Sequence, residues 1–140
     1  MNEPEISVVS PTREHCDVLE KSLRTVTAQD YGNLDIVISD NFSTDETEDV
    51  VRSANDARVR YINTGQRLSM SHNWEFALSN VDDSGWATII GDDDGLLPGS
   101  IEKVAEIIQS AGVPAVRSSV CGRCTGVEPY NCRACRKCLS

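Results

Sequence analysis

Long apolar runs are missing from this sequence of 140 residues. No stretch is long enough to cross a bilayer, and residues 1–5 are polar and acidic, unlike the start of a secretory signal peptide. These absences predict a cytoplasmic chain without a transmembrane segment. The length allows one domain with a substantial core and hardly a second.

Two glycine-rich phosphate-binding motifs are also absent. The dinucleotide fingerprint GxGxxG does not follow the first apolar run, and the loop GxxxxGK[ST] does not occur. A site that binds phosphates in this chain must therefore hold them by another route, such as a metal ion bound by carboxylates.

Charge is divided unevenly along the chain, whose net charge is −9. Residues 117–140 contain five basic residues and one acid, a net charge of +4, so residues 1–116 carry −13. The negative charge of residues 1–116 argues against binding of nucleic acid through phosphate contacts. It does not argue against a nucleotide whose phosphates bind together with a metal.

Apolar spacing predicts strands that alternate with helices. Short apolar runs indicate strands at 6–10, 34–39, 59–62 and 87–90. Helical spacing of apolar residues indicates helices at 17–29, 44–54, 70–78 and 101–108. Ser43 and Glu46 have the spacing of a capping box at the start of the second helix. The alternation predicts an α/β fold with a mainly parallel open sheet and flanking helices.

Three consecutive carboxylates, Asp92, Asp93 and Asp94, follow the last expected strand. Ligands of open α/β sheets bind beyond the carboxyl ends of the strands, where the loops at 11–14 and 40–41 should also open. Hard divalent cations prefer carboxylate oxygens. We therefore predict a metal site at 92–94, although an acidic surface turn has the same composition.

Several ordered motifs together resemble the family 2 glycosyltransferases, which have the GT-A fold. They are ISVVSPT, VISDNFSTDET, NTG followed by MSHNWEFAL, and IIGDDDGLLPGSIE, and they cover about residues 5–110. The resemblance implies inverting transfer of a sugar from a nucleotide-diphosphate donor, usually UDP- or dTDP-linked, to an acceptor hydroxyl. It also implies Mn²⁺ or Mg²⁺ as cofactor, and a glycan or lipid-linked acceptor in polysaccharide biosynthesis.

The same resemblance implies roles for individual residues. It puts the following residues in donor-binding loops: Pro11, Thr12, Glu14, Asp40, Gly65 and Asn73. Asp40 would contact the base, although its position before Ser43 also suits a turn. Asp93 is the implied principal metal ligand, Asp92 binds the ribose or the metal, and Asp94 assists.

Two positions depart from the family pattern. Gly91 stands where many members have their first acid. His72 stands where arginine is common, so Arg67, in the same loop, is a candidate phosphate contact or a solvated loop residue. For His15 we predict a solvated or helix-capping imidazole.

The acceptor half of the family, with the carboxylate that deprotonates the attacking hydroxyl, follows the acidic motif by many residues. No residue after Pro114 matches it, so the catalytic base is unknown, and we expect this chain to supply only the donor and metal half. An exposed sheet edge in such a half would favour self-association.

Cysteines gather in the basic segment 117–140, whereas Cys16 is alone and predicts inert packing. Two CxxC pairs, Cys121 with Cys124 and Cys132 with Cys135, have the spacing of a Zn²⁺ site. Alternatively, the segment does not belong to the fold, since composition and charge change near residue 116. The expected division is therefore a nucleotide-sugar-binding part at 1–116 and a Cys-rich tail at 117–140.

Two other functions compete with the enzyme. A non-catalytic zinc-knuckle interaction module on an α/β scaffold would use the tail. A receiver-like regulatory domain would also bind Mg²⁺ with acids at strand ends, but its order of motifs differs and no late lysine follows the acids here.

Overall fold

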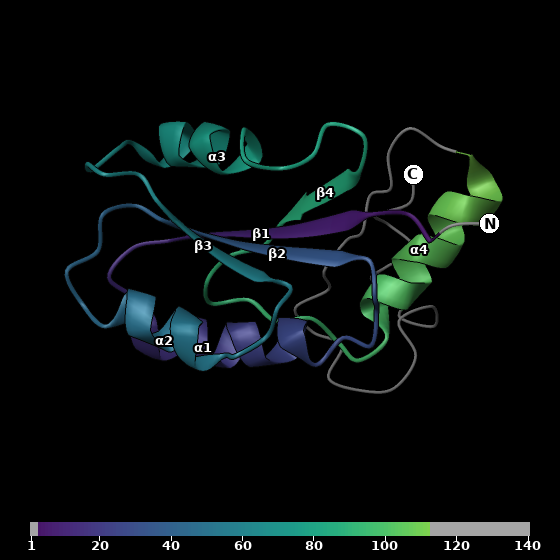
Figure 1. Cartoon of the computed structure of the whole chain (residues 1–140), viewed down its shortest axis with the longest axis horizontal. Helices are drawn as coiled ribbons and strands as arrows, with labels where there is room; N and C mark the ends of the chain where they lie inside the picture. The colour runs from purple at the N-terminus through teal and green to yellow at the C-terminus, as the bar shows by residue number, and fades with distance from the viewer. Residues whose placement is uncertain (1–2, 113–140) are drawn as a thin grey trace, which may run out of the picture.

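The structure is a computed structural model that describes residues 3–112. Strands and helices alternate along the chain (Figure 1). They are β1 (Ile6–Thr12), α1 (Cys16–Thr27), β2 (Leu34–Asp40), α2 (Thr47–Ser53), β3 (Val59–Asn63), α3 (Met70–Leu78), β4 (Trp86–Ile89) and α4 (Ser100–Ala111). The predicted alternation is confirmed, with shifts at the element ends. The tail at 117–140 and its predicted zinc site lie outside the described residues.

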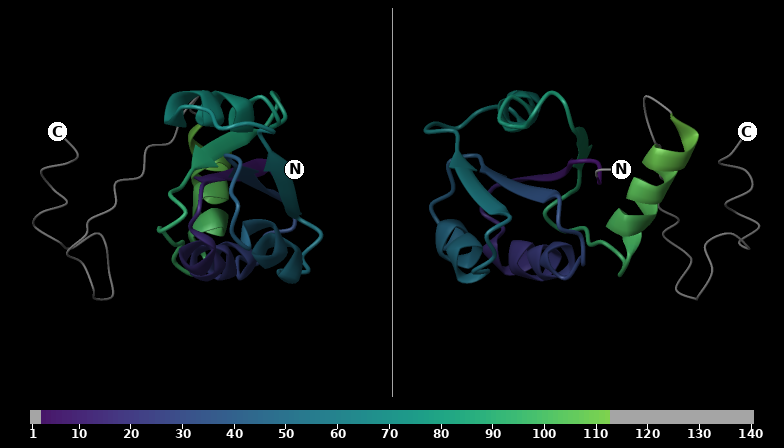
Figure 2. Two further views of the ribbon diagram at one scale, coloured as in Figure 1. Left: turned by 90° about the vertical axis from the view of Figure 1, so that its left-hand side faces the viewer. Right: turned by 45° about the vertical axis from the view of Figure 1, so that its right-hand side comes forward.

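The four strands form one parallel sheet in the order β3-β2-β1-β4. Helix α3 covers one face, and α1, α2 and α4 lie toward the other (Figures 1 and 2). The central strands β1 and β2 are buried on both faces, which explains why they read as continuous apolar runs. Parallel strands bring all four carboxyl ends to one edge of the sheet, where the loops after them meet.

The core is divided by the sheet into two clusters. The larger one joins Val8, Ile36 and Ile38 to α1 and α4, through residues such as Leu19 and Ile101. The smaller one joins Val9 and Val37 to Ala77 of α3. The strand side chains alternate between these clusters with the period of two that a pleated strand imposes.

The capping box predicted for α2 is wrong. The helix begins at Thr47, and the Ser43 hydroxyl instead accepts a hydrogen bond from the backbone N–H of Glu14 at 2.9 Å. Glu46 occupies the N-cap position without a side-chain capping bond. Asp45 accepts from the N–H of Thr47, the first helical residue, at 3.1 Å, and its other oxygen accepts from the Cys16 N–H at 3.0 Å. A contact between two loops, invisible in local spacing, takes the Ser43 side chain away from the helix.

The apolar spacing that predicts α3 does not describe its buried face. Met70 is 72% exposed and Trp74 42% exposed, whereas Ala77 and the polar Asn73 are buried. The Asn73 carboxamide accepts a hydrogen bond from the Ser39 hydroxyl at 2.8 Å, at the end of β2. This bond turns the polar side chain inward and leaves the two larger apolar ones at the surface.

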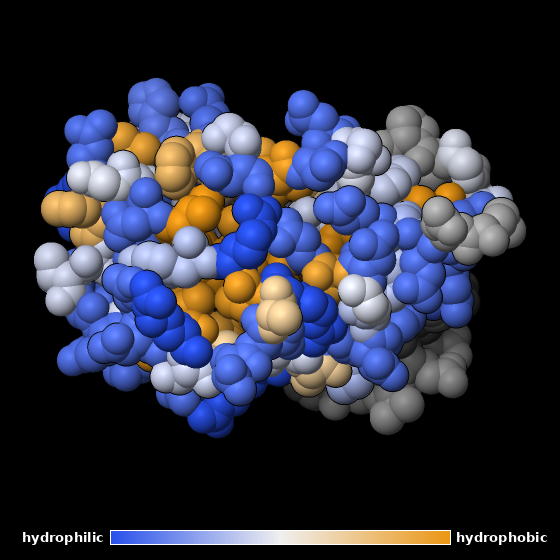
Figure 3. All heavy atoms as spheres, viewed as in Figure 1, coloured by the Kyte–Doolittle hydropathy of each residue, from blue (hydrophilic) through white to orange (hydrophobic). Residues whose placement is uncertain are grey.

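Strands β3 and β4 are the outer strands of the sheet formed by residues 3–112. Figure 3 views the molecule onto the β3 side and shows apolar surface between α3 and the layer of α1 and α2. Self-association through such an edge stays a prediction. Within the described part of the chain, no helix combines the length and apolar character that crossing a membrane requires.

Candidate donor-binding site

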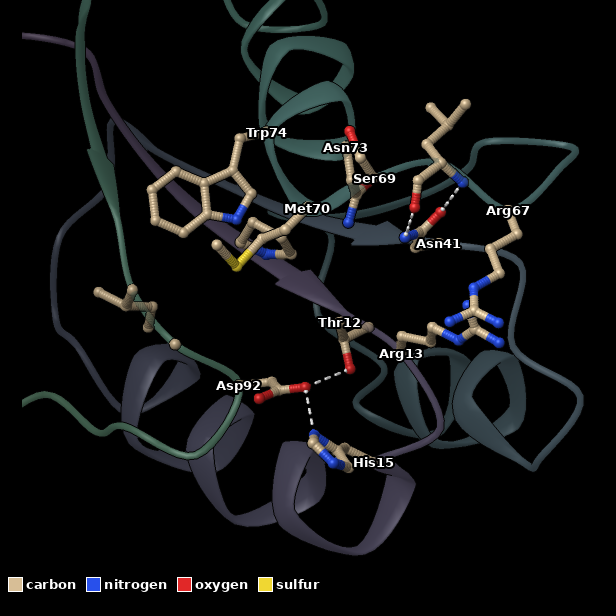
Figure 4. Close-up of a pocket in the computed structure, with 14 residues that line it drawn as sticks. Thr12, Arg13, His15, Asn41, Arg67, Ser69, Met70, Asn73, Trp74 and Asp92 are labelled. Carbon is tan, nitrogen blue, oxygen red and sulfur yellow. Dashed lines mark hydrogen bonds and ion pairs between the residues drawn. The ribbon is translucent and has the colours of Figure 1, made fainter.

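A cavity of about 650 Å³ opens at the carboxyl ends of the strands (Figure 4). The end of β1 and its loop, the residue after β2, the loop before α3, the first turns of α3 and the residues after β4 form its walls. The lining residues are Pro11, Thr12, Arg13, His15, Asn41, Arg67, Leu68, Ser69, Met70, Asn73, Trp74, Ile90, Gly91 and Asp92.

The structure brings five of the predicted site residues to this cavity: Pro11, Thr12, Arg67, Asn73 and Asp92. The other predicted residues do not line it: Glu14, Asp40, Gly65, Asp93 and Asp94. Sequence reasoning missed Arg13, His15, Asn41, Met70 and Trp74. Arg13 and Asn41 could have been found from the sequence, because they belong to the loops at 11–14 and 40–41 that were expected at this edge.

Asp92 is held by two partners from the β1 side. Its Oδ2 accepts a hydrogen bond from the buried Thr12 hydroxyl at 2.8 Å and lies 3.1 Å from His15 Nδ1. His15 occupies the N-cap position of α1, but its ring makes no capping hydrogen bond. The predicted capping bond is therefore absent, whereas the predicted exposure to solvent is confirmed, because the His15 side chain is 60% exposed. Since β1 and β4 are neighbours, the Asp92 carboxylate still reaches this exposed ring.

The Asp93 and Asp94 carboxylates converge on Gly91. A Cβ at Gly91 would lie 2.7 Å from Asp93 Oδ1 and 2.9 Å from Asp94 Oδ2, and the Gly91 N–H donates to Asp94 Oδ2 at 3.2 Å. In the described residues, no group of three or more His, Cys, Asp or Glu side chains is arranged to hold a metal. Two converging carboxylates still fit Mn²⁺ or Mg²⁺, since such an ion commonly takes its other ligands from water and substrate phosphates.

Asp40 lies at the end of β2 and is only 1% exposed. Its Oδ1 accepts from the Ser43 N–H at 2.9 Å, and its Oδ2 accepts from the Tyr61 hydroxyl at 2.6 Å and from Asn63 Nδ2 at 3.3 Å. Burial of the phenol and its bond to Asp40 raise the pKa of Tyr61 to about 12. A contact of Asp40 with a base would therefore require one of these donors to leave.

Side-chain contacts fasten the loops around the cavity. The Asn41 carboxamide donates to the Leu68 carbonyl at 2.9 Å and accepts from the Leu68 N–H at 2.7 Å. Glu14, whose φ is 52°, accepts from the Thr44 N–H at 2.7 Å. Gly65 has a φ of 72° in the loop before α3, a conformation that suits glycine. These contacts hold in position the backbone on either side of the pocket.

The family model described as "Glycosyl transferase family 2" matches residues 7–130, so the match continues past residue 116. A curated relative, the GalNAc(5)-diNAcBac-PP-undecaprenol beta-1,3-glucosyltransferase of Campylobacter jejuni, is 30% identical over 106 residues. That alignment covers 74% of this chain and 34% of the relative. The chain spans about a third of the length of the curated relatives it matches.

Solved structures share the fold. TarS 1-349 of S. aureus superposes with a TM-score of 0.69 at 20% identity, over 75% of this chain and 32% of that one, and its complex with UDP-GlcNAc also matches. The mannosyltransferase PcManGT of Pyrobaculum calidifontis, in complex with GDP-Man and Mn²⁺, has a TM-score of 0.67 at 24% identity. That match covers 83% of this chain and 34% of the other.

Proposed function

Because this chain belongs to glycosyl transferase family 2, we propose that it forms the donor-binding part of an inverting glycosyltransferase. The observation that carries the proposal is the cavity of about 650 Å³ at the carboxyl edge of the parallel sheet. Nucleotides bind at this edge in open α/β folds because the loops after the strands converge there. The proposed donor is a nucleotide-diphosphate sugar.

The ligands of two fold neighbours support this choice. TarS was solved with UDP-GlcNAc, and PcManGT with GDP-Man and Mn²⁺. In this chain, Asp93 and Asp94 would hold the divalent ion. When bound, that ion would supply positive charge for the departing diphosphate. Asp92, oriented by Thr12 and His15, would accept hydrogen bonds from the donor at the cavity wall.

Of the remaining predicted residues, some line the cavity and the others hold the loops around it in position. Trp74 and Met70 provide an apolar wall, and Pro11 and Asn73 line the cavity beside them. We assign Glu14, Asp40 and Gly65 to holding the loops, on the hydrogen bonds and backbone angles described above. For the complete enzyme we propose a glycan or lipid-linked acceptor, since the Campylobacter relative is named for an undecaprenol-linked one.

The test is a calorimetric titration of the chain with UDP and with dTDP, with and without Mn²⁺. We expect binding that Mn²⁺ strengthens, and an Asp93→Ala variant that loses at least about tenfold in affinity with Mn²⁺ present, roughly 1.4 kcal/mol. Asp83→Ala, which removes an exposed aspartate in the turn before β4, is the matched control and should bind like the parent. If the folded parent binds neither nucleotide under any of these conditions, the proposal is wrong.

Gly91→Ala tests the paired carboxylates separately. A Cβ would collide with the mobile ends of Asp93 and Asp94 rather than with backbone, so we expect less than about 0.5 kcal/mol change in unfolding free energy. The displaced carboxylates should weaken Mn²⁺ binding roughly tenfold. Gly32→Ala, where a Cβ meets only Glu3 Oε2 at 3.9 Å, is the control. If Gly91→Ala binds Mn²⁺ as tightly as the parent, Asp93 and Asp94 do not hold the metal ion.

A further inference from the structure

Two arginines at the cavity, Arg13 and Arg67, differ from the other arginines of the described region in having no carboxylate partner. Within residues 3–112, four arginine side chains are paired with carboxylates: Arg24 with Glu20, Arg52 with Glu48, Arg58 with Asp56, and Arg60 with Asp35. The guanidinium groups of Arg13 and Arg67 have no hydrogen bond or ion pair to any of these described residues. Both line the cavity, in a chain that carries 22 acidic residues.

Figure 4 shows the two guanidinium groups gathered on one side of the cavity, with Asp92 and His15 on another. Cations that line one cavity repel each other unless an anion lies between them. Among the described residues, Asp92 has the only carboxylate that lines the cavity, and its Oδ2 already meets Thr12 and His15. The arginine side of the cavity therefore carries positive charge that the described residues do not neutralise.

The backbone beside each arginine is fixed, although the side chains are unpaired. Leu68, next to Arg67, is bound through both its N–H and its carbonyl to Asn41. Glu14, next to Arg13, donates its N–H to the Ser43 hydroxyl and accepts from Thr44 in a left-handed backbone conformation with a φ of 52°. A non-glycine residue in this conformation is strained and persists where the surrounding contacts hold it. Positioned backbones with free guanidinium heads are pre-organised for an anion.

From this geometry we infer that Arg13 and Arg67 together bind the diphosphate of the donor, an inference that rests on the proposed function. Guanidinium groups bind phosphate oxygens through two parallel N–H donors, and each keeps its charge at any physiological pH. Two of them offer enough donors for both phosphates of a nucleoside diphosphate. The diphosphate thus keeps side-chain partners in the absence of metal, in place of the glycine-rich loop that this sequence lacks.

The experiment compares Arg13→Gln, Arg67→Gln and the control Arg24→Gln, whose side chain pairs with Glu20 on the exposed face of α1. UDP, inorganic pyrophosphate and uridine are titrated calorimetrically with EDTA, and UDP again with Mn²⁺. We expect UDP and pyrophosphate to bind the parent without metal, and each cavity variant to bind them roughly tenfold more weakly. Uridine binding and the melting temperature should be the same in all four proteins.

The possible outcomes separate this inference from the proposed function. UDP binding that needs Mn²⁺ and is unchanged in both cavity variants would overturn the inference and leave the proposed function standing. Equal weakening of uridine and UDP would also overturn it, because the arginines would then contact the base. Pyrophosphate binding that depends on both arginines, without any binding of UDP, would support the anion site and contradict the proposed function.

Discussion

An Asp40→Ala variant is expected to lose about 3 kcal/mol of unfolding free energy, roughly a hundredfold in the ratio of folded to unfolded protein. The Asp40 carboxylate is buried and accepts hydrogen bonds from Ser43, Tyr61 and Asn63. Removing it leaves the Ser43 N–H and the Tyr61 hydroxyl without their acceptor, whereas the exposed Asn63 keeps its bond to the Tyr61 oxygen. A buried donor that loses its partner costs its full desolvation penalty. Urea denaturation at pH 7 measures the change.

Graded variants separate lost hydrogen bonds from lost volume. Asp40→Asn keeps the size of the side chain and one carbonyl acceptor, so we expect a smaller loss than with alanine. Tyr61→Phe removes a single donor, at a cost of about 1 kcal/mol. If Asp40→Ala unfolds at the same urea concentration as the parent, these bonds do not support the loops, and Asp40 would be available to a ligand.

Arg58→Met is the second substitution with a large expected effect, again about 3 kcal/mol. The Arg58 guanidinium donates to the carbonyls of Thr27, Gln29 and Tyr31 at 2.8, 2.8 and 3.1 Å. These carbonyls belong to the last residue of α1 and to the loop that connects α1 to β2. Methionine fills similar space but donates nothing, so three carbonyls lose a partner together.

Arg58 also makes part of the stability depend on pH. Its hydrogen bonds lower the pKa of Asp56 below the ordinary value of 3.8, although burial acts in the opposite direction. A carboxyl group whose pKa is lowered by folding stabilises the protein above its unfolded pKa, and this contribution is lost as pH falls through the folded pKa. The difference in unfolding free energy between the parent and Arg58→Met should therefore narrow below about pH 4.

The control for both measurements is Arg52→Met. Arg52 pairs with Glu48 one turn away on the exposed surface of α2, and solvent screens such pairs so that they contribute little to stability. We expect little loss of stability and no change in its pH dependence below pH 4. A loss in Arg52→Met as large as that in Arg58→Met would mean that removing any arginine charge destabilises this acidic chain.

The sequence by itself determined the α/β class, the order of the elements and the edge of the sheet at which a ligand would bind. These depend on local information, since apolar spacing distinguishes strands from helices and parallel strands end at one edge. The ordered motifs also identified the family, which the match over residues 7–130 confirms. Neither inference required knowing which distant side chains meet.

Only the tertiary structure decided which side chains line the cavity. Asp92 meets Thr12 and His15 from 80 and 77 positions away, and this contact exists because β4 pairs with β1. The Ser43 hydroxyl likewise bonds to a residue distant in sequence, the N–H of Glu14, and does not cap α2 as predicted. Whether an arginine is paired likewise depends on where distant acids lie, so Arg13 and Arg67 could not be told from Arg58 by spacing alone. Local patterns determine the elements, whereas the chemistry of the cavity depends on contacts that form only when those elements pack.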